Sequence, residues 1–163
     1  MKQTLKEKLD FNKSRDKLIS FLDSRDDPVM VLGTSANNRV ITREVLIINN
    51  DLDLYFFTWK YSRKTEQIKI NNNVSLCKDK IEIEGKAEIL GLLTMKENER
   101  ILEMIRKIHP DSIDRWKSRP NMILIQIKPV FACIDGYIEN DYSYLEYINL
   151  MKKESYRLKW ADY

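Results

Sequence analysis

The alternation of apolar and polar positions along the chain predicts a mainly β protein that carries helices at both ends. Apolar residues between Leu5 and Leu22 recur at helical spacing and stop before the polar stretch that leads to Pro28, so we expect an opening helix. Later apolar runs, separated by short polar turns, predict strands joined mainly by hairpins. We expect these strands over residues 29–35, 40–48, 54–58, 74–78, 80–90, 122–128 and 130–138, with Pro129 separating the last two.

Helical spacing also appears inside the chain and at its end. Ser62 is a natural N-cap for a short helix over 65–71 that Arg63 and Lys64 open. Thr94 and Glu97 have the spacing of a capping box, and they predict a helix with one apolar stripe up to Ile108. Residues 109–120 predict a connector with one helical turn. From Tyr142 onward we expect a last amphipathic helix, with one face formed by Tyr144, Tyr147, Ile148 and Met151.

Together these elements predict a fold class. The first three strands form a meander, and Gly85 marks a bulge in the strand over 80–90. Six to seven short strands joined by hairpins, with helices inserted and at the ends, predict an antiparallel β-barrel with peripheral helices. No repeat or flexible linker divides the chain, so we expect one domain over residues 1–163.

Composition narrows the function classes. A formal charge of +3, from 28 basic and 25 acidic residues, argues against nucleic-acid binding through the overall field. The chain shows no signal-peptide core, and its apolar runs are too short for a membrane span, so we expect a cytoplasmic protein without a membrane partner. Cys77 and Cys133 lie in apolar strands, and we interpret both as buried and reduced.

The cations before the short helix point to an anion. A helix N-terminus favours acidic side chains, yet Lys60, Arg63 and Lys64 gather there. Arg43 shares a strand face with aliphatic residues, and a half-buried guanidinium needs a partner such as phosphate. Together with Ser62 and the free N–H groups of the helix start, these cations could hold one phosphate group. Solvated surface residues are the alternative, since each such charge costs only about 0.3–1 kcal/mol.

The order of several short motifs carries a resemblance. The stretch "TREVLIINNDLDLYFFTWKYSRKTEQIKINNNVSLC", followed by "IEIEGKAEIL", resembles the core of the pyridoxamine 5'-phosphate oxidase-like family of FMN-binding split barrels. The resemblance covers about residues 28–90, and a weaker resemblance extends over "MILIQIKPVFACIDG". This family is an antiparallel split barrel that forms a homodimer, with FMN held in two clefts between the subunits. The resemblance therefore implies FMN as the cofactor and a second copy of the chain as the partner.

The family's cofactor contacts carry over by position. Arg43 and its strand neighbours Glu44 and Val45 would run beside the flavin. Phe57 and Thr58 would line the ribityl chain, and Arg63 with Lys64, next to Ser62, would hold the phosphate. Trp116 is a candidate aromatic wall supplied across the dimer.

Departures from the family pattern limit the implied activity. Where the oxidase proper has a glutamine before its "GKAE"-like stretch, this chain has Lys80, which either tunes the flavin or is a solvated turn residue. The chain also lacks the Arg-Leu-Ala-Pro ending that binds the oxidase's substrate. Oxidation of pyridoxamine phosphate is therefore not expected, and the shorter general-stress-type relatives are closer in length.

Other chemistry-bearing residues favour structural interpretations. The sole histidine, His109, has no cysteine or carboxylate at ligand spacing, so we expect no metal site. Glu82 and Glu84 share a strand face and could mimic a catalytic pair, but such a stripe is more often the solvated side of a strand. No residue stands out as catalytic.

Three function classes remain open. The first is an FMN-dependent oxidoreductase acting on a small molecule, with NAD(P)H or another reductant as electron source. The second is a non-catalytic relative that binds flavin, deazaflavin or haem. The third is a small basic barrel that binds single-stranded nucleic acid. It would use the cations Lys60, Arg63 and Lys64 and the aromatic side chains of Trp59 and Tyr61.

Overall fold

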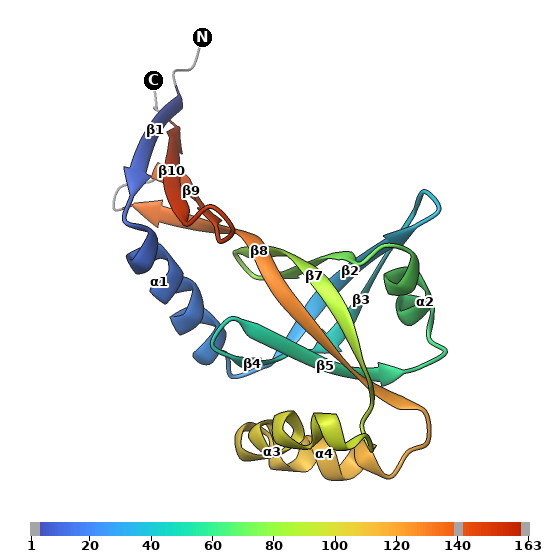
Figure 1. Cartoon of the computed structure of the whole chain (residues 1–163). Helices are drawn as coiled ribbons and strands as arrows, with labels where there is room; N and C mark the ends of the chain where they lie inside the picture. The colour runs from blue at the N-terminus through green and yellow to red at the C-terminus, as the bar shows by residue number, and fades with distance from the viewer. Residues whose placement is uncertain (1–3, 139–141, 161–163) are drawn as a thin grey trace.

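The computed structural model describes residues 4–138 and 142–160, which form one antiparallel sheet with helices around it (Figure 1). Ten strands belong to this sheet, in the order β1-β10-β9-β8-β7-β6-β2-β3, while β5 pairs with β8 and with β4. The strands are β1 (Thr4–Leu9), β2 (Val29–Ala36), β3 (Arg39–Leu46), β4 (Ile48–Asn50), β5 (Asp53–Trp59), β6 (Asn73–Lys78), β7 (Ile81–Leu92), β8 (Met122–Ile138), β9 (Tyr142–Asn149) and β10 (Glu154–Trp160). The helices are α1 (Phe11–Asp23), α2 (Arg63–Ile70), the 3-10 turn η1 (Lys96–Asn98), α3 (Glu99–Ile108) and α4 (Pro110–Lys117). The predicted fold class, an antiparallel split barrel with peripheral helices, is confirmed.

The longest pairing of the sheet is the antiparallel ladder of β7 and β8, which η1, α3 and α4 connect. We expected Pro129 to separate two strands, but β8 runs through it as one strand of 17 residues. The ladder shifts register between Glu84 and Gly85, and Pro129 lies opposite Gly85 at this bulge. Proline is tolerated in a strand where a bulge interrupts the hydrogen-bond ladder, which explains why β8 continues. The predicted bulge at Gly85 is confirmed.

The first half of β8 belongs to the barrel. It pairs with β7 on one side and with β5 on the other, while β2 pairs with β3 and β6. The predicted hairpin of residues 29–48 is present, with Asn37 and Asn38 at positive φ in its turn. The predicted meander is wrong, because the third strand pairs with β8 and the short β4 instead of β3. In the described residues no ladder joins β3 to β5, so the barrel is split between these two strands.

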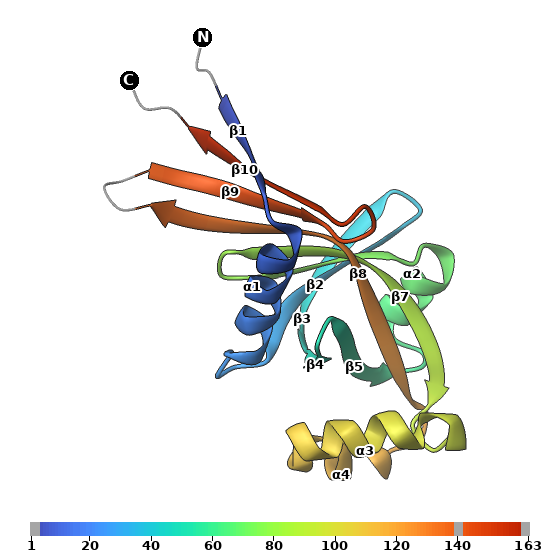
Figure 2. The ribbon, with the colours of Figure 1, turned by 60° about the vertical axis from the view of Figure 1, so that its left-hand side comes forward.

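The second half of β8 belongs to an extension of the sheet, which Figure 2 shows projecting away from the barrel. There β8 pairs with β9, β9 with β10, and β10 with β1, while α1 lies beside β9 and β10. The prediction for the opening segment is therefore wrong in part, and the prediction of a last helix is wrong. The opening segment is a strand before it becomes α1, and the segment from Tyr142 is a hairpin instead of a helix.

These two errors arise because the apolar spacing of the terminal segments fits a helix as well as a strand. Tyr144 and Ile148 are four residues apart, which places them on one face of a helix but also on one face of a strand. Pairing with distant strands decides the outcome, since β9 lies against β8 and β10. Helix α1 begins later than expected, at Phe11, where the Asp10 side chain accepts a hydrogen bond from the Lys13 N–H.

Helices α3 and α4 form a hairpin below the barrel. The predicted capping box is wrong, because neither Met95 nor Asn98, the N-cap residues of η1 and α3, makes a side-chain cap. The buried Asn98 amide donates instead to the carbonyls of Leu90 and Leu92, which ties the helix start to the end of β7. The connector is more helical than expected, since it contains the whole of α4.

Two apolar clusters hold these parts together. The larger one fills the barrel and includes Leu32, Phe56 and Ile125, while the smaller one joins the barrel to α3 and α4 through Leu102, Ile105 and other residues. The predicted apolar stripe of α3 is buried at Leu102 and Ile105, but its last residue, Ile108, is exposed. Cys77 is exposed on the outer face of β6 and Cys133 is partly buried, both as free thiols, so the prediction that both are buried is wrong for Cys77.

Within residues 4–138 and 142–160, no helix has the length and apolar character that crossing a membrane would require. The same residues contain no group of three or more His, Cys, Asp or Glu side chains arranged to hold a metal ion.

Candidate functional site

The split between β3 and β5 opens into a cleft of about 300 Å³. Residues from both strands form its walls, and the start of α2, the end of α4 and the start of β8 complete it. The lining residues are Glu44, Val45, Leu46, Phe57, Thr58, Trp59, Lys64, Trp116 and Met122. Six of the sequence-predicted cofactor residues are thus brought together here, namely Glu44, Val45, Phe57, Thr58, Lys64 and Trp116. The walls are mainly apolar and aromatic, and Lys64 and Glu44 are the charged lining residues, so the cleft suits a planar organic ligand with a polar end.

A chain of hydroxyl groups organises the start of α2 beside this cleft. Ser62 is the N-cap, as predicted, and its Oγ accepts a hydrogen bond from the Thr65 N–H. The Ser62 hydroxyl also lies 3.2 Å from Thr58 Oγ1 and 2.9 Å from Thr65 Oγ1. Lys64 Nζ donates to Thr58 Oγ1 at 3.1 Å, so the ammonium group is held over the end of β5. The helix start, β5 and the lysine therefore form one structural unit.

Arg43 approaches from β3, where its partly buried side chain lies on the same face as the predicted aliphatic residues. Its Nη1 donates to Thr34 Oγ1 at 2.6 Å, and its Nη2 donates to Gln67 Oε1 at 3.3 Å. Thr34 comes from the neighbouring strand β2 and Gln67 from α2, so the guanidinium lies between the sheet and the helix. Both acceptors are neutral, and the positive charge of Arg43 is therefore not compensated by them.

Three cations lie near one another around the start of α2, namely Lys64, which lines the cleft, and Arg43 and Arg63, which do not line it. Burial lowers the pKa of Arg43, and the nearby charge of Arg63 lowers it further. Burial also lowers the pKa of Lys64, and the charge of Arg43 adds to this effect. Among the described residues, no carboxylate lies within 4 Å of these three side chains in an ion pair. Mutual repulsion without a protein counter-charge is the electrostatic signature of an anion site.

Four predicted cofactor residues do not line the cleft, namely Arg43, Ser62, Arg63 and Lys80, and Trp116 lines it in a different way from the one expected. Lys80 lies in the turn between β6 and β7, where its carbonyl accepts a hydrogen bond from the Asp135 N–H, and it does not line the cleft. Trp116 was expected to reach a cofactor across a dimer, but it lines the cleft of its own chain from α4. The Arg119 guanidinium lies 4.7 Å from the Trp116 ring centroid, which helps to orient the ring.

Several residues of this site were missed by sequence reasoning. Leu46 and Met122 line the cleft, and Thr34 and Gln67 bind Arg43. One signal could have found Gln67, because it follows Arg63 by four residues and thus shares its face of the helix. Thr34 carried no such local signal, since its contact with Arg43 comes from the pairing of β2 with β3.

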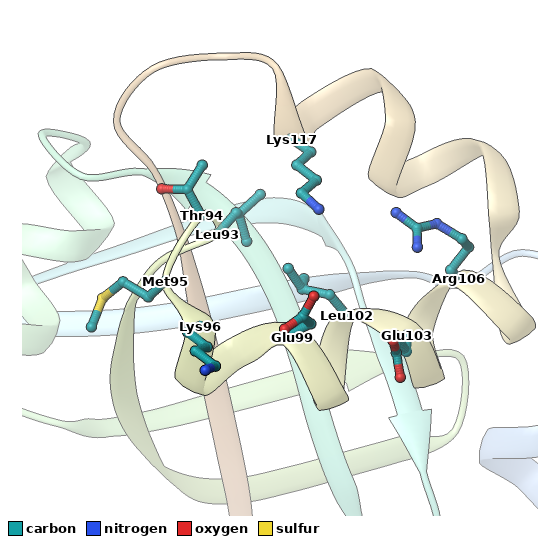
Figure 3. Close-up of a pocket in the computed structure, with 9 residues that line it drawn as sticks. All are labelled: Leu93, Thr94, Met95, Lys96, Glu99, Leu102, Glu103, Arg106 and Lys117. Atoms are coloured by element: carbon teal, nitrogen blue, oxygen red, sulfur yellow. The ribbon is translucent and has the colours of Figure 1, made fainter.

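Other pockets lack this charge pattern. Figure 3 shows one of about 210 Å³ between the end of β7 and the helical hairpin, where Lys117 and Arg106 point toward one another above Glu99. Its lining carries both signs of charge, with Lys96, Arg106 and Lys117 beside Glu99 and Glu103. Another pocket, lined by His109, Asp111 and Arg115, is separated from the cleft by Leu46 and Trp116, which line both. Glu82 and Glu84 are exposed on the outer face of β7, as their structural interpretation predicted.

The sequence matches no protein-family model and no curated protein, whereas solved structures match its fold. A candidate pyridoxamine 5'-phosphate oxidase from Listeria innocua is 25% identical with a TM-score of 0.58, covering 74% of this chain and 97% of its own. General stress protein 26 from Bacillus anthracis is also 25% identical, with a TM-score of 0.59, and covers 84% of this chain and 98% of its own. The general stress protein thus matches the larger share of this chain.

Solved structures of lower identity share this fold, and their names give different ligands. An FAD-binding protein from Mesorhizobium loti is 14% identical with a TM-score of 0.54, and it covers 98% of this chain and 100% of its own. HutZ, a haem storage protein from Vibrio cholerae, is also 14% identical with a TM-score of 0.57, and it covers 70% of this chain and 88% of its own. At this identity the likeness shows the fold alone, so the ligand of this chain has to be argued from its own residues.

Proposed function

The chain has the split-barrel fold of the pyridoxamine 5'-phosphate oxidase-like proteins, and from this premise we propose that it is an FMN-binding oxidoreductase that acts on a small molecule. The observation that carries the proposal is the cluster of Arg43, Arg63 and Lys64, which has no carboxylate partner in the described residues and borders an aromatic cleft that Lys64 lines. A phosphomonoester, which carries close to two negative charges at neutral pH, supplies the missing counter-charge.

The residues present fit a phosphorylated flavin. Arg63 and Lys64 at the start of α2, with Ser62 as the N-cap, form a cationic end for the phosphate, where the helix dipole adds to the attraction. Phe57, Val45 and Trp116 provide apolar surface for a planar ring system. A bound flavin supplies hydride and electron transfer, while these side chains position it, exclude water and influence its potential.

We further propose that two copies of the chain assemble and that the cleft is completed at their interface. The support is that the cleft lies at an open split of the barrel, with Trp59 58% exposed at its edge and Leu46 38% exposed. Exposed apolar side chains around a ligand cleft suit a surface that a partner covers. Sedimentation or light scattering of the purified chain tests this directly, and a monomer that retains flavin contradicts it.

The first test is the absorption spectrum of the purified chain. An oxidised flavin spectrum supports the proposal, and anaerobic bleaching by NADH or NADPH then identifies an electron donor. A Soret band instead of a flavin spectrum favours haem, as in HutZ. A colourless protein that retains an oligonucleotide in a salt-dependent manner favours the nucleic-acid alternative, with Trp59 and Tyr61 as exposed stacking surfaces.

The second test is the double substitution Arg63→Ala with Lys64→Ala. Two charge-assisted contacts to the phosphate are removed, so we expect FMN affinity to fall on the order of 100-fold or more with an unchanged circular dichroism spectrum. The matched control is Lys69→Ala with Lys128→Ala, which removes the same charge from two surface ion pairs, Lys69–Glu66 and Lys128–Glu88. If the first variant still purifies yellow, the phosphate site is misplaced.

A further inference from the structure

Arg43 is held by neutral side chains that are themselves fixed. Gln67 is only 9% exposed and Thr34 only 2%, so neither can relax into solvent. Gln67 Nε2 donates to the Arg39 carbonyl at 3.1 Å, while Gln67 Oε1 accepts from the Thr34 hydroxyl at 2.7 Å. These two bonds set the orientation of the amide, so that its oxygen faces the guanidinium of Arg43. Arg43 is therefore held from two elements, β2 through Thr34 and α2 through Gln67, and Gln67 is itself fixed by the Arg39 carbonyl at the start of β3.

The chemical nature of these acceptors is informative. A carboxylate at either position would hold Arg43 more firmly, but it would also neutralise the charge that attracts an anion. An amide and a hydroxyl position the guanidinium and leave its positive charge available. Burial lowers the pKa of Arg43, yet arginine remains protonated in proteins, so the charge persists.

We propose that Gln67 is a positioning residue that, with Thr34, orients Arg43 toward the phosphate of the bound flavin. This inference rests on the proposed function, because it deepens the account of the same phosphate site. Neither Gln67 nor Arg43 lines the cleft, but the Arg43 charge acts on Lys64, which does, and Gln67 Oε1 accepts a hydrogen bond from Arg43 Nη2. A purely structural glutamine, by contrast, would support the packing of α2 on β2 without affecting which ligand the cleft prefers.

The test compares FMN with riboflavin, which lacks only the phosphate. The full-length protein is dialysed against equal concentrations of both flavins, and the bound flavins are separated and measured. Wild-type protein is expected to retain mainly FMN. Gln67→Met keeps the length of the side chain but removes its oxygen and its amide group. We expect this change to lower the bound ratio of FMN to riboflavin about tenfold, the effect of one charge-assisted hydrogen bond, while riboflavin affinity stays within about twofold.

Two further variants separate positioning from structure. Gln67→Glu is expected to lower the ratio more than Gln67→Met, since the new carboxylate pairs with Arg43 and repels the phosphate. In an Arg43→Met background, Gln67→Met should change the ratio no further, because the residue through which Gln67 acts is gone. The matched control is Gln126→Met, which removes side-chain bonds to Asp53 and Tyr55 outside the cleft and should leave the ratio unchanged.

The outcomes are distinguishable. If wild-type protein binds neither flavin, or binds both equally, the proposed phosphate site is wrong and this inference falls with it. If wild-type protein prefers FMN but Gln67→Met keeps the same ratio, the proposed function stands and the positioning role is refuted. If Gln67→Met weakens FMN and riboflavin alike, or still acts in the Arg43→Met background, the role of Gln67 is structural only.

Discussion

Glu146 in β9 offers a sharp test of how the extension of the sheet is held to α1. Its side chain is only 3% exposed, and one carboxylate oxygen, Oε2, accepts from Lys17 Nζ at 2.8 Å and from Arg157 Nη2 at 3.3 Å. Lys17 comes from α1 and Arg157 from β10, so this carboxylate joins three elements. The perturbation is Glu146→Gln, which keeps the shape of the side chain and removes its charge.

The size of the effect follows from these contacts. Each charge-assisted hydrogen bond contributes about 1.5–3 kcal/mol, and removing one member of a buried ion cluster leaves the remaining charges without compensation. Lys17 is 42% exposed and can return to water, which reduces the penalty. We therefore expect Glu146→Gln to lower the free energy of unfolding by about 3 kcal/mol and the melting temperature by roughly 6–12 °C.

Urea unfolding followed by circular dichroism measures this change, with Glu88→Gln as the matched control. Glu88 accepts from Lys128 at 3.0 Å on the same sheet, but both side chains are more than half exposed. That surface pair should contribute less than about 1 kcal/mol. If Glu146→Gln costs no more than Glu88→Gln, the carboxylate does not hold the extension in place and the reasoning is refuted.

The pH dependence provides a second check on the same residue. Burial alone would raise the pKa of Glu146, but hydrogen bonds from Lys17, Ser14 and Arg157 outweigh it and hold the pKa below its ordinary value of 4.5. The stabilisation is therefore fully present above pH 4.5 and is lost as pH falls through the lower, folded-state pKa. The stability difference between wild type and Glu146→Gln should shrink in acid, and a difference that grows there contradicts the assignment.

Two further predictions concern the bulge and the cleft. Gly85→Ala should lower the free energy of unfolding in urea by about 1–3 kcal/mol. The reason is that a Cβ at this position would lie 2.6 Å from Ile127 Cγ2 and 3.1 Å from the Lys128 carbonyl oxygen. An unchanged urea midpoint would mean that the bulge adapts freely. Because the pKa of Lys64 lies below 10.5, the ratio of bound FMN to riboflavin should begin to fall at a lower pH than an ordinary lysine would allow. In Lys64→Arg, whose side chain stays charged, the ratio should hold to higher pH, and identical profiles would exclude Lys64 as the titrating group.

Local patterns predicted those parts of the fold that depend on nearby residues. The turn at Asn37 and Asn38, the Ser62 cap of α2 and the bulge at Gly85 each follow from a few neighbouring side chains, and the structure contains all three. The capping box at Thr94 shows the limit of such reasoning. There the buried Asn98 amide binds carbonyls of β7, and this tertiary contact determined where the helix begins.

Contacts between distant residues account for what was missed. Residues 142–149 became a strand because β8 and β10 were available to pair with it, although its spacing also fits a helix. In the site, the resemblance placed Arg43 and Lys64, whereas Gln67 and Thr34 emerged only when β2, β3 and α2 came together. Lys80 was placed by its position before "EGKAE", but it lies in the turn between β6 and β7 and does not line the cleft.

The pairing of the first strand with the last has a mechanical consequence. Thr4 lies opposite Trp160, and the ladder runs inward from this pair to Leu9 opposite Ser155. A force that pulls Thr4 away from Trp160 therefore breaks the hydrogen bonds of this ladder one after another instead of shearing them all at once. The strands β1 and β10 should therefore separate at low force. Until they separate, Thr4 and Trp160 stay side by side, and so do any partners attached beyond them.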